Sequence, residues 1–134
     1  MSMKITRNDL KNYQNNILAI HELDDELKAA YNTYRSPSFS SNGSGKPLNP
    51  SSPTERAMKN IQRLEKKQNE FYAKIEACED FVNGIQDGLI YAACRDHYIN
   101  GFSWEATCNH LKNYRSKSVI ISMVNNYFDE AGLE

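Results

Sequence analysis

The stretch YINGFSWEATCNHL, residues 98–111, decides the fold of this chain, because one helix ends within it and another begins. Asn100-Gly101 is a typical helix stop, since glycine readily adopts the left-handed conformation that closes a helix. Ser103 is a good N-cap, and Glu105 falls in the first turn of the next helix, where a carboxylate interacts favourably with the helix dipole. The stretch therefore predicts two helices separated by a tight connection.

Short helices are expected on both sides of this stop. The helix before it begins near Leu89, and Ser116 caps a last helix after a turn at residues 112–115. Each helix carries one apolar stripe, and the three stripes are Leu89, Ile90, Ala93, Cys94, His97 and Tyr98; Trp104, Thr107, Cys108 and Leu111; and Val119, Ile120, Met123, Val124, Tyr127 and Phe128. Three short helices, the last two joined by a tight turn, form the layout of a helix-turn-helix, in which Cys108 takes the place of the small buried residue.

Two long helices are predicted upstream of this unit. The first spans residues 6–35, opens with the capping box of Thr6 and Asp9, and is interrupted in its apolar seam by Asp24, where the neighbouring Leu23 fills part of the gap. The second opens at Ser52 and runs to about residue 85, with Gln68 as its polar interruption. The two seams are Leu10, Tyr13, Ile17, Ile20, Asp24, Leu27, Tyr31 and Tyr34; and Ala57, Ile61, Leu64, Gln68, Phe71, Ile75, Cys78, Val82 and Ile85.

Two apolar stripes on one chain are most simply buried against each other. We therefore expect an all-α protein in which a long antiparallel, coiled-coil-like hairpin (residues 1–86) precedes a three-helix helix-turn-helix domain (residues 87–134). Residues 36–51, rich in Ser, Gly, Asn and Pro, form a flexible loop between the long helices. A parallel dimeric coiled coil is the competing arrangement, because each stripe could instead pack against the same stripe of a second copy of the chain.

Composition excludes several classes of protein. The chain has 134 residues, a formal net charge of -1 and three cysteines, which gives neither a global basic signal nor a disulfide framework. No apolar run is long enough to span a bilayer and no signal peptide opens the chain, so we expect a cytoplasmic protein, in the host cytoplasm if phage-encoded. The GSGK at residues 43–46 fails the phosphate-loop pattern, because Ser40 and Pro47 stand where Gly and Ser or Thr are needed.

Catalytic and metal sites are not indicated by the sequence. The three histidines are scattered, and no nucleophile has a base at a suitable spacing, so we expect neither an enzyme nor a cofactor nor a small-molecule ligand. Cys94, His97, Cys108 and His110 hint at zinc, but the helical stripes explain the first three as core residues. We therefore expect no metal.

The stretch DHYINGFSWEATCNHL resembles the helix-turn-helix of sigma-factor region four. Six positions match that family's pattern: Tyr98, Gly101, Ser103, Trp104, Glu105 and Leu111. In its whole layout, including SPTERAM at residues 52–58, the chain is similar to phage late-gene regulators of the RinA/ArpU type. The resemblance implies a phage activator of transcription that binds double-stranded DNA, contacts RNA polymerase and acts as a homodimer. The family's turn usually contains a glycine, and its last helix normally carries several Arg and Lys, whereas this one carries Lys117 and little else.

The last helix is the expected recognition helix. Serine and asparagine side chains contact base edges, and Arg and Lys hold phosphates. We expect the DNA contacts to come from Lys112, Arg115, Ser116, Lys117, Ser118, Ser122 and Asn125. The basic residues of 56–67 either add backbone contacts or form a solvated helix face. Two alternative functions stay open, namely a helical module that binds a host or phage protein, and a recognition subunit for phage DNA packaging.

Overall fold

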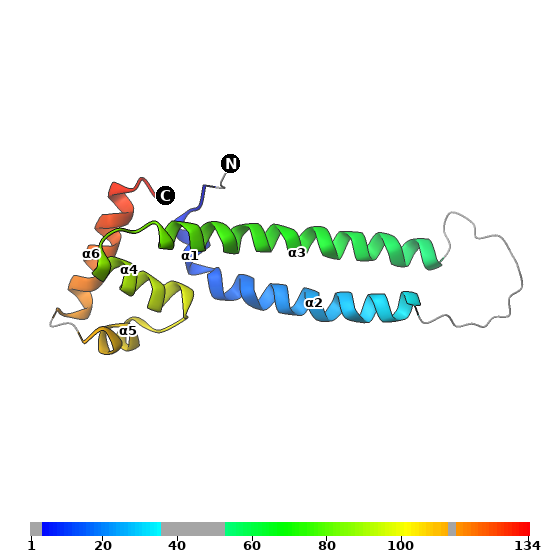
Figure 1. Ribbon diagram of the computed structural model, residues 1–134, viewed down its shortest axis with the longest axis horizontal. Coiled ribbons are helices and arrows are strands. Elements are labelled where there is room, and N and C mark those ends of the chain that lie inside the picture. Colours follow the sequence, from blue (N-terminus) through cyan, green and yellow to red (C-terminus); the bar gives the residue numbers. More distant parts are fainter. Residues whose placement is uncertain (1–3, 36–52, 113–114) are drawn as a thin grey trace, which may run out of the picture. The chain divides into compact units, whose positions relative to one another are not determined.

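The computed structural model describes residues 4–35, 53–112 and 115–134, which contain helices and no strands (Figure 1). The all-α prediction is therefore confirmed. The elements are α1 (Arg7–Lys11), α2 (Tyr13–Arg35), α3 (Pro53–Asn83), α4 (Gly88–Cys94), a π-helical turn η1 (Arg95–Ile99), α5 (Trp104–Leu111) and α6 (Lys117–Glu130). The predicted loop 36–51 and the predicted cap at Ser52 lie outside the described residues.

The chain divides into two compact units. One combines Met1–Ile17 with Ala73–Glu134, and the other is the continuous segment Leu18–Tyr72. The first unit thus includes the N-terminal residues, which the sequence-based boundary at 86/87 assigns to the hairpin element. We call these the head unit and the hairpin unit.

In the hairpin unit, α2 and α3 run side by side in opposite directions (Figure 1). Ile20, Leu27 and Ile61 of the predicted seams are buried between them. The polar seam position Gln68 is satisfied, because its Nε2 donates a hydrogen bond to the carbonyl of Ile20 at 3.2 Å. Asp24 is exposed and pairs with Lys28 at 3.3 Å, while Leu23 beside it is 9% exposed, in agreement with its expected place beside the gap. Pairing within one chain thus buries a large part of both seams, while Tyr31 of the first seam is 37% exposed.

The long first helix predicted over residues 6–35 is wrong in one respect, because the structure breaks it at Asn12 into α1 and α2. The capping box at its start is confirmed: Thr6 Oγ1 accepts a hydrogen bond from Asp9 N at 3.2 Å, and Thr6 N donates to Asp9 Oδ2 at 2.9 Å. Asn12 has φ −92° and ψ 4°, outside the helical region. Asparagine competes locally with the helical backbone for hydrogen bonds, so it tolerates such a break.

The core of the head unit surrounds Phe128 of α6. Its edges meet the rings of Phe81 and Tyr98, both with centroids 5.9 Å from that of Phe128. Side chains from four helices are fully buried with it, namely Cys78, Val82, Cys94, Thr107, Ile120 and Val124. Burying a side chain of this size stabilises a fold by about 1.5–3 kcal/mol, so this cluster holds α3, α4, α5 and α6 together.

Arg7 fastens the end of α6 to the beginning of the chain. Its backbone N–H donates to the carbonyl of Glu134 at 2.6 Å, and its Nε donates to the carbonyl of Leu133 at 3.0 Å. The guanidinium also pairs with Asp129 and lies 5.6 Å from the ring centroid of Phe128. We call this set of contacts the Arg7 clamp; the sequence patterns gave no indication of it.

Candidate nucleic-acid interface

The predicted stop and restart at residues 100–103 are confirmed. The π-helical turn η1 ends where Asn100 N donates to the carbonyl of Arg95 at 2.9 Å, and Gly101 then takes φ +79°. Ser103 caps α5, since its Oγ accepts a hydrogen bond from Ala106 N at 3.0 Å. The wide turn before the stop was not predicted, and apolar periodicity does not distinguish it from an ordinary helical turn.

A stack of aromatic rings joins this stop to α5. The rings of His97 and Trp104 are nearly parallel, with centroids 3.9 Å apart, and Tyr98 meets Trp104 edge-on at 6.0 Å. His97 Nδ1 donates to the carbonyl of Phe102 at 2.7 Å, which fixes the ring. Burial lowers the pKa of His97, so its imidazole is neutral at pH 7. Trp104 therefore packs the three-helix unit.

A buried carboxylate also ties η1 to the end of α5. Asp96 is 5% exposed, and its Oδ2 lies 2.6 Å from Nδ1 of His110. Cys94 is fully buried, and Cys108 is half-buried. Within the described ranges, no group of three or more His, Cys, Asp or Glu side chains is arranged to hold a metal ion.

The expectation that Cys108 is the small buried residue of the motif is wrong, because the neighbouring Thr107 takes that place. Thr107 is 0% exposed, whereas Cys108 lies at the margin of the core. The Oγ1 of Thr107 has no hydrogen-bond partner in the described part of the chain. A hydroxyl buried without a partner destabilises a fold by about 1–3 kcal/mol.

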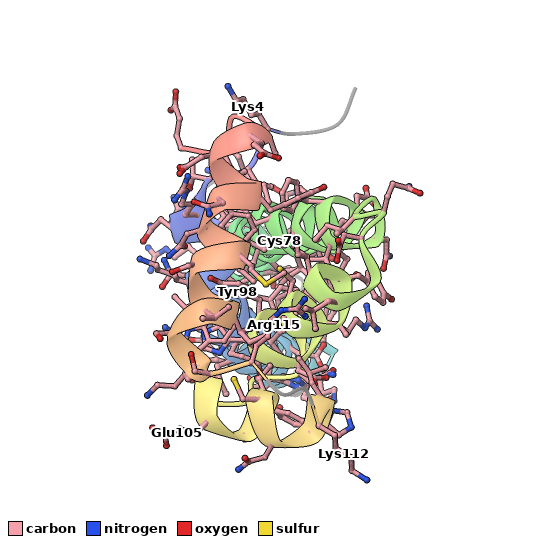
Figure 2. The ribbon with its side chains drawn as sticks, turned by 90° about the vertical axis from the view of Figure 1, so that its left-hand side faces the viewer. Lys4, Cys78, Tyr98, Glu105, Lys112 and Arg115 are labelled. Atoms are coloured by element: carbon pink, nitrogen blue, oxygen red, sulfur yellow. The ribbon has the colours of Figure 1, made fainter. Side chains whose placement is uncertain are left out.

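All seven residues predicted to contact DNA are exposed, and they gather at the turn and along one side of α6. Lys112 closes α5 in the left-handed conformation, with φ 51°, and lies with Glu105 at the outer edge of the unit (Figure 2). Ser116 is the confirmed cap of α6: its Oγ accepts a hydrogen bond from Val119 N at 3.4 Å and lies 3.2 Å from Oγ of Ser118. The cap leaves Ser116 less able than Ser118 to contact a base.

Acidic partners reduce the positive charge of this surface. Lys117 Nζ lies 3.1 Å from Oε1 of Glu105 on α5, so this cation is already paired. Asp129, at the far end of the same side of α6, belongs to the Arg7 clamp. Val119 was expected in the apolar stripe of the last helix, but its side chain is 43% exposed beside Ser118. The surface thus offers the exposed side chains of Lys112 and Arg115, together with hydroxyl and amide groups.

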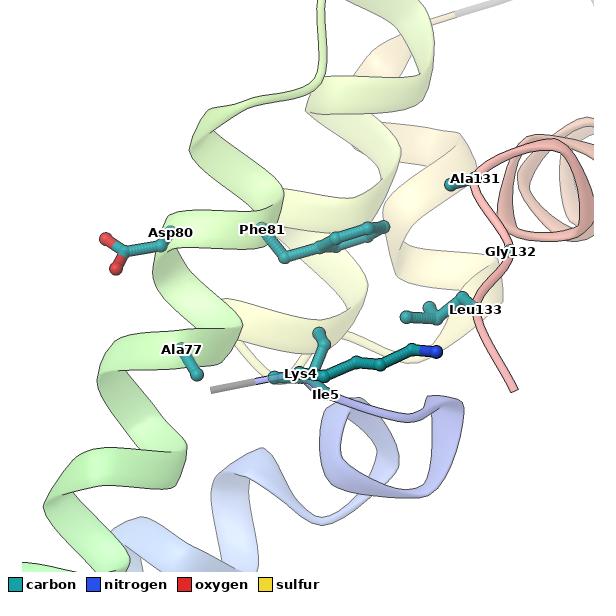
Figure 3. A pocket seen from close by; sticks show the side chains of 8 residues that line it. All are labelled: Lys4, Ile5, Ala77, Asp80, Phe81, Ala131, Gly132 and Leu133. Atoms are coloured by element: carbon teal, nitrogen blue, oxygen red, sulfur yellow. The ribbon is translucent and has the colours of Figure 1, made fainter. Parts of the chain in front are cut away.

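A hollow of about 280 Å³ lies in the head unit away from this surface. Figure 3 shows Phe81, Leu133 and Lys4 pointing into it, while the carboxylate of Asp80 points outward. Its remaining lining is aliphatic or backbone, from Ile5, Ala77, Ala131 and Gly132. Ligand pockets combine apolar walls with several convergent polar groups. The lining of this hollow is mainly apolar and does not bring several polar groups together.

Comparisons with family models, with curated proteins and with solved structures returned no match to the chain. None of the helices in residues 4–35, 53–112 and 115–134 has the length and apolar character required to cross a membrane.

Proposed function

We propose that this protein is a sequence-specific DNA-binding transcriptional regulator of the phage late-gene activator type. The observation that supports it most is the trihelical packing of α4, α5 and α6, in which Lys112 and residues 115–119 are exposed. In helix-turn-helix proteins the N-terminal residues of the second helix of the motif contact base edges in the major groove. The resemblance of residues 97–111 to sigma-factor region four agrees with this assignment.

The side of α6 that carries Ser118, Ser122 and Asn125 is suited to base contacts. These positions are spaced by four and three residues, so they lie along one side of the helix. Asparagine makes a bidentate pair with adenine, and serine contacts any base. Lys112 ends α5 and Arg115 precedes α6, at the connection where a phosphate of the DNA backbone passes in such complexes.

The low positive charge of this surface favours a weak monomer. Phosphate contacts supply most non-specific DNA affinity, and Lys117 is already paired with Glu105. A homodimer would double the contacts and would select palindromic half-sites about one helical turn apart. RNA polymerase is the second partner that this function implies.

A helical protein-binding module is the second candidate function. It is favoured by large apolar side chains exposed in the hairpin unit, where Leu18 is 65% and Tyr72 49% exposed. Under this hypothesis the helix-turn-helix is only a scaffold, and the chain has no measurable DNA affinity at low salt.

The test begins by selecting a binding site from a pool of random double-stranded DNA with the full-length protein. Fluorescence anisotropy then measures the affinity for the selected duplex and for its scrambled form between 50 and 300 mM salt. We expect Asn125→Ala to abolish most of the preference for the selected duplex, by about 1–3 kcal/mol. Lys112→Ala with Arg115→Ala should weaken both duplexes and lower the salt slope by about 2.

The matched control is Lys11→Ala, which removes one exposed cation from α1. It should leave the preference for the selected duplex unchanged, and circular dichroism should show that every variant keeps its helix content. Failure to select any sequence, with a defined dimer still present by light scattering, would favour the protein-binding module.

A further inference from the structure

We propose that four cations on α3 form a second binding surface for DNA, which contacts the phosphate backbone without regard to sequence. They are Arg56, Lys59, Arg63 and Lys66, and we call them the α3 stripe. The stripe belongs to the hairpin unit and is separate in sequence from the α6 surface. That the ligand of the α3 stripe is DNA rests on the proposed function, whereas the cationic character of the α3 stripe does not depend on it.

The positions of the α3 stripe place all four cations on one side of α3. They are spaced by three, four and three residues and extend over about 15 Å of helix. All four are exposed. The buried seam residue Ile61, which is 1% exposed, lies on the opposite side of the same turns, so a ligand reaches the stripe without disturbing the packing of α3 on α2.

The stripe is poorly neutralised, which distinguishes it from an ordinary solvated helix face. Arg56, Arg63 and Lys66 have no ion-pair or hydrogen-bond partner within the described residues, and Lys59 has only Glu55 at a loose 3.8 Å. Three cations elsewhere have closer partners: Lys28 pairs with Asp24, Lys117 with Glu105, and Arg7 with Asp129.

Acidic residues near the stripe are engaged by other groups. Glu65 accepts a hydrogen bond from the hydroxyl of Tyr31 at 2.9 Å, and Glu70 pairs with Lys67 at 3.8 Å. Like charges three or four residues apart on a helix repel each other. An external anion removes this repulsion.

A phosphodiester backbone fits the stripe better than an acidic peptide does. Two of the four cations are arginines, whose planar fork binds phosphate oxygens in a bidentate manner. The stripe is rigid and regular, and so is duplex DNA, which carries one charge per about 1.7 Å of its axis. The net charge of -1 on the whole chain supplies no general attraction to DNA, so the local stripe is where such attraction arises.

The test replaces three of the cations in the full-length protein: Arg56→Gln, Arg63→Gln and Lys66→Gln. Glutamine is a good helix former, so α3 is retained. The probes are the selected duplex and its scrambled form, measured by anisotropy at several salt concentrations. We expect both affinities to fall by the same factor, between tenfold and a hundredfold, and the salt slope to fall by about 2.7, which corresponds to three lost phosphate contacts.

Two controls isolate the position of the charge. The first control is a triple variant that removes the same net charge outside α3: Lys4→Gln, Lys11→Gln and Lys28→Gln. Its salt dependence of DNA affinity should differ from that of the original protein by no more than about one phosphate contact. Arg56→Lys with Arg63→Lys keeps the charge and should retain most of the affinity. An equal loss in the first control and in the stripe variant would overturn the inference, as would displacement of DNA by poly-glutamate at equal charge concentration.

The two proposals fail in different ways. If both duplexes bind equally and the stripe variant weakens both, the α3 stripe stands while sequence-specific regulation is refuted. If the stripe variant binds like its control while the Lys112 and Arg115 variant loses affinity, regulation stands and the stripe is refuted.

Discussion

Thr107→Val tests the packing of the three-helix unit most directly. The hydroxyl of Thr107 is 0% exposed and has no partner among the described residues, while its backbone N–H is satisfied by the carbonyl of Ser103 at 2.9 Å. Valine has nearly the same shape and replaces the hydroxyl with a methyl group. Because the buried hydroxyl costs about 1–3 kcal/mol, we expect the free energy of unfolding to rise by about 1–2 kcal/mol.

Urea denaturation provides the measurement. The fluorescence of Trp104, the single tryptophan, reports the head unit, and circular dichroism reports the helices of both units. With a slope near 1.5 kcal/mol/M, the midpoint should move upward by about 1 M while the slope stays the same. DNA affinity should not change, because Thr107 does not reach the surface.

Thr33→Val is the matched control for this substitution. Thr33 is also a helical threonine, but it is exposed and its Oγ1 donates to the carbonyl of Ala29 at 3.0 Å. The control should change stability by less than about 0.5 kcal/mol. A Thr107→Val protein that is no more stable than the original would show that the hydroxyl has a hydrogen-bond acceptor. That result would contradict the arrangement of side chains around α5 described above.

Three further predictions concern the surface, the helix stop and the thiols. Glu105→Gln should release Lys117 and raise DNA affinity up to about fivefold, since an exposed ion pair is worth at most about 1 kcal/mol; anisotropy that shows no gain would mean that Lys117 takes no part in binding. Gly101→Ala should lower the free energy of unfolding by about 1–2 kcal/mol, because φ is +79° there and a Cβ would lie 3.1 Å from Gln14; the Gly88→Ala control meets no atom. Burial raises the pKa of the Cys78 and Cys94 thiols to about 12, so at pH 8 a thiol reagent should modify them only in urea. Because these pKa values are raised in the folded protein, the two thiols contribute to the free energy of unfolding fully below pH 9 and lose this contribution between pH 9 and 12. Urea denaturation at pH 8 and at pH 11 would detect the loss.

Local signals allowed much of the fold to be predicted. The caps at Thr6, Ser103 and Ser116 and the stop at Gly101 depend on neighbours within four residues, and each lies where the sequence places it. The seams of α2 and α3 were predictable for the same reason, because helical periodicity decides which side is buried.

Features that depend on distant residues were not predictable. Arg7 contacts residues more than a hundred positions away, and nothing near Arg7 marks it as a clamp. The pairing of Asp96 with His110 depends on how η1 turns, and η1 itself has no sequence signal. Thr107, and not the expected Cys108, is the buried residue of α5. The two positions are neighbours, and the apolar periodicity of an eight-residue helix does not distinguish which of them faces the core.

The candidate site was predictable in its exposure but not in its charge. All seven predicted residues are on the surface, since polar residues opposite an apolar stripe are normally solvated. The pairing of Lys117 with Glu105 brings together residues twelve positions apart across a turn, so it required the packing of α5 on α6.

The Arg7 clamp has a consequence for how the protein is made. During synthesis, Arg7 leaves the ribosome long before Asp129, Leu133 and Glu134 exist to receive it. Arg7 therefore cannot form these contacts before the last helix has been synthesised. The hairpin unit, in contrast, is one continuous segment, so all of its own contacts can form as soon as that segment has left the ribosome. We expect nascent chains to acquire protease resistance first in the hairpin unit, and in residues 4–17 only after Asp129, Leu133 and Glu134 have left the ribosome.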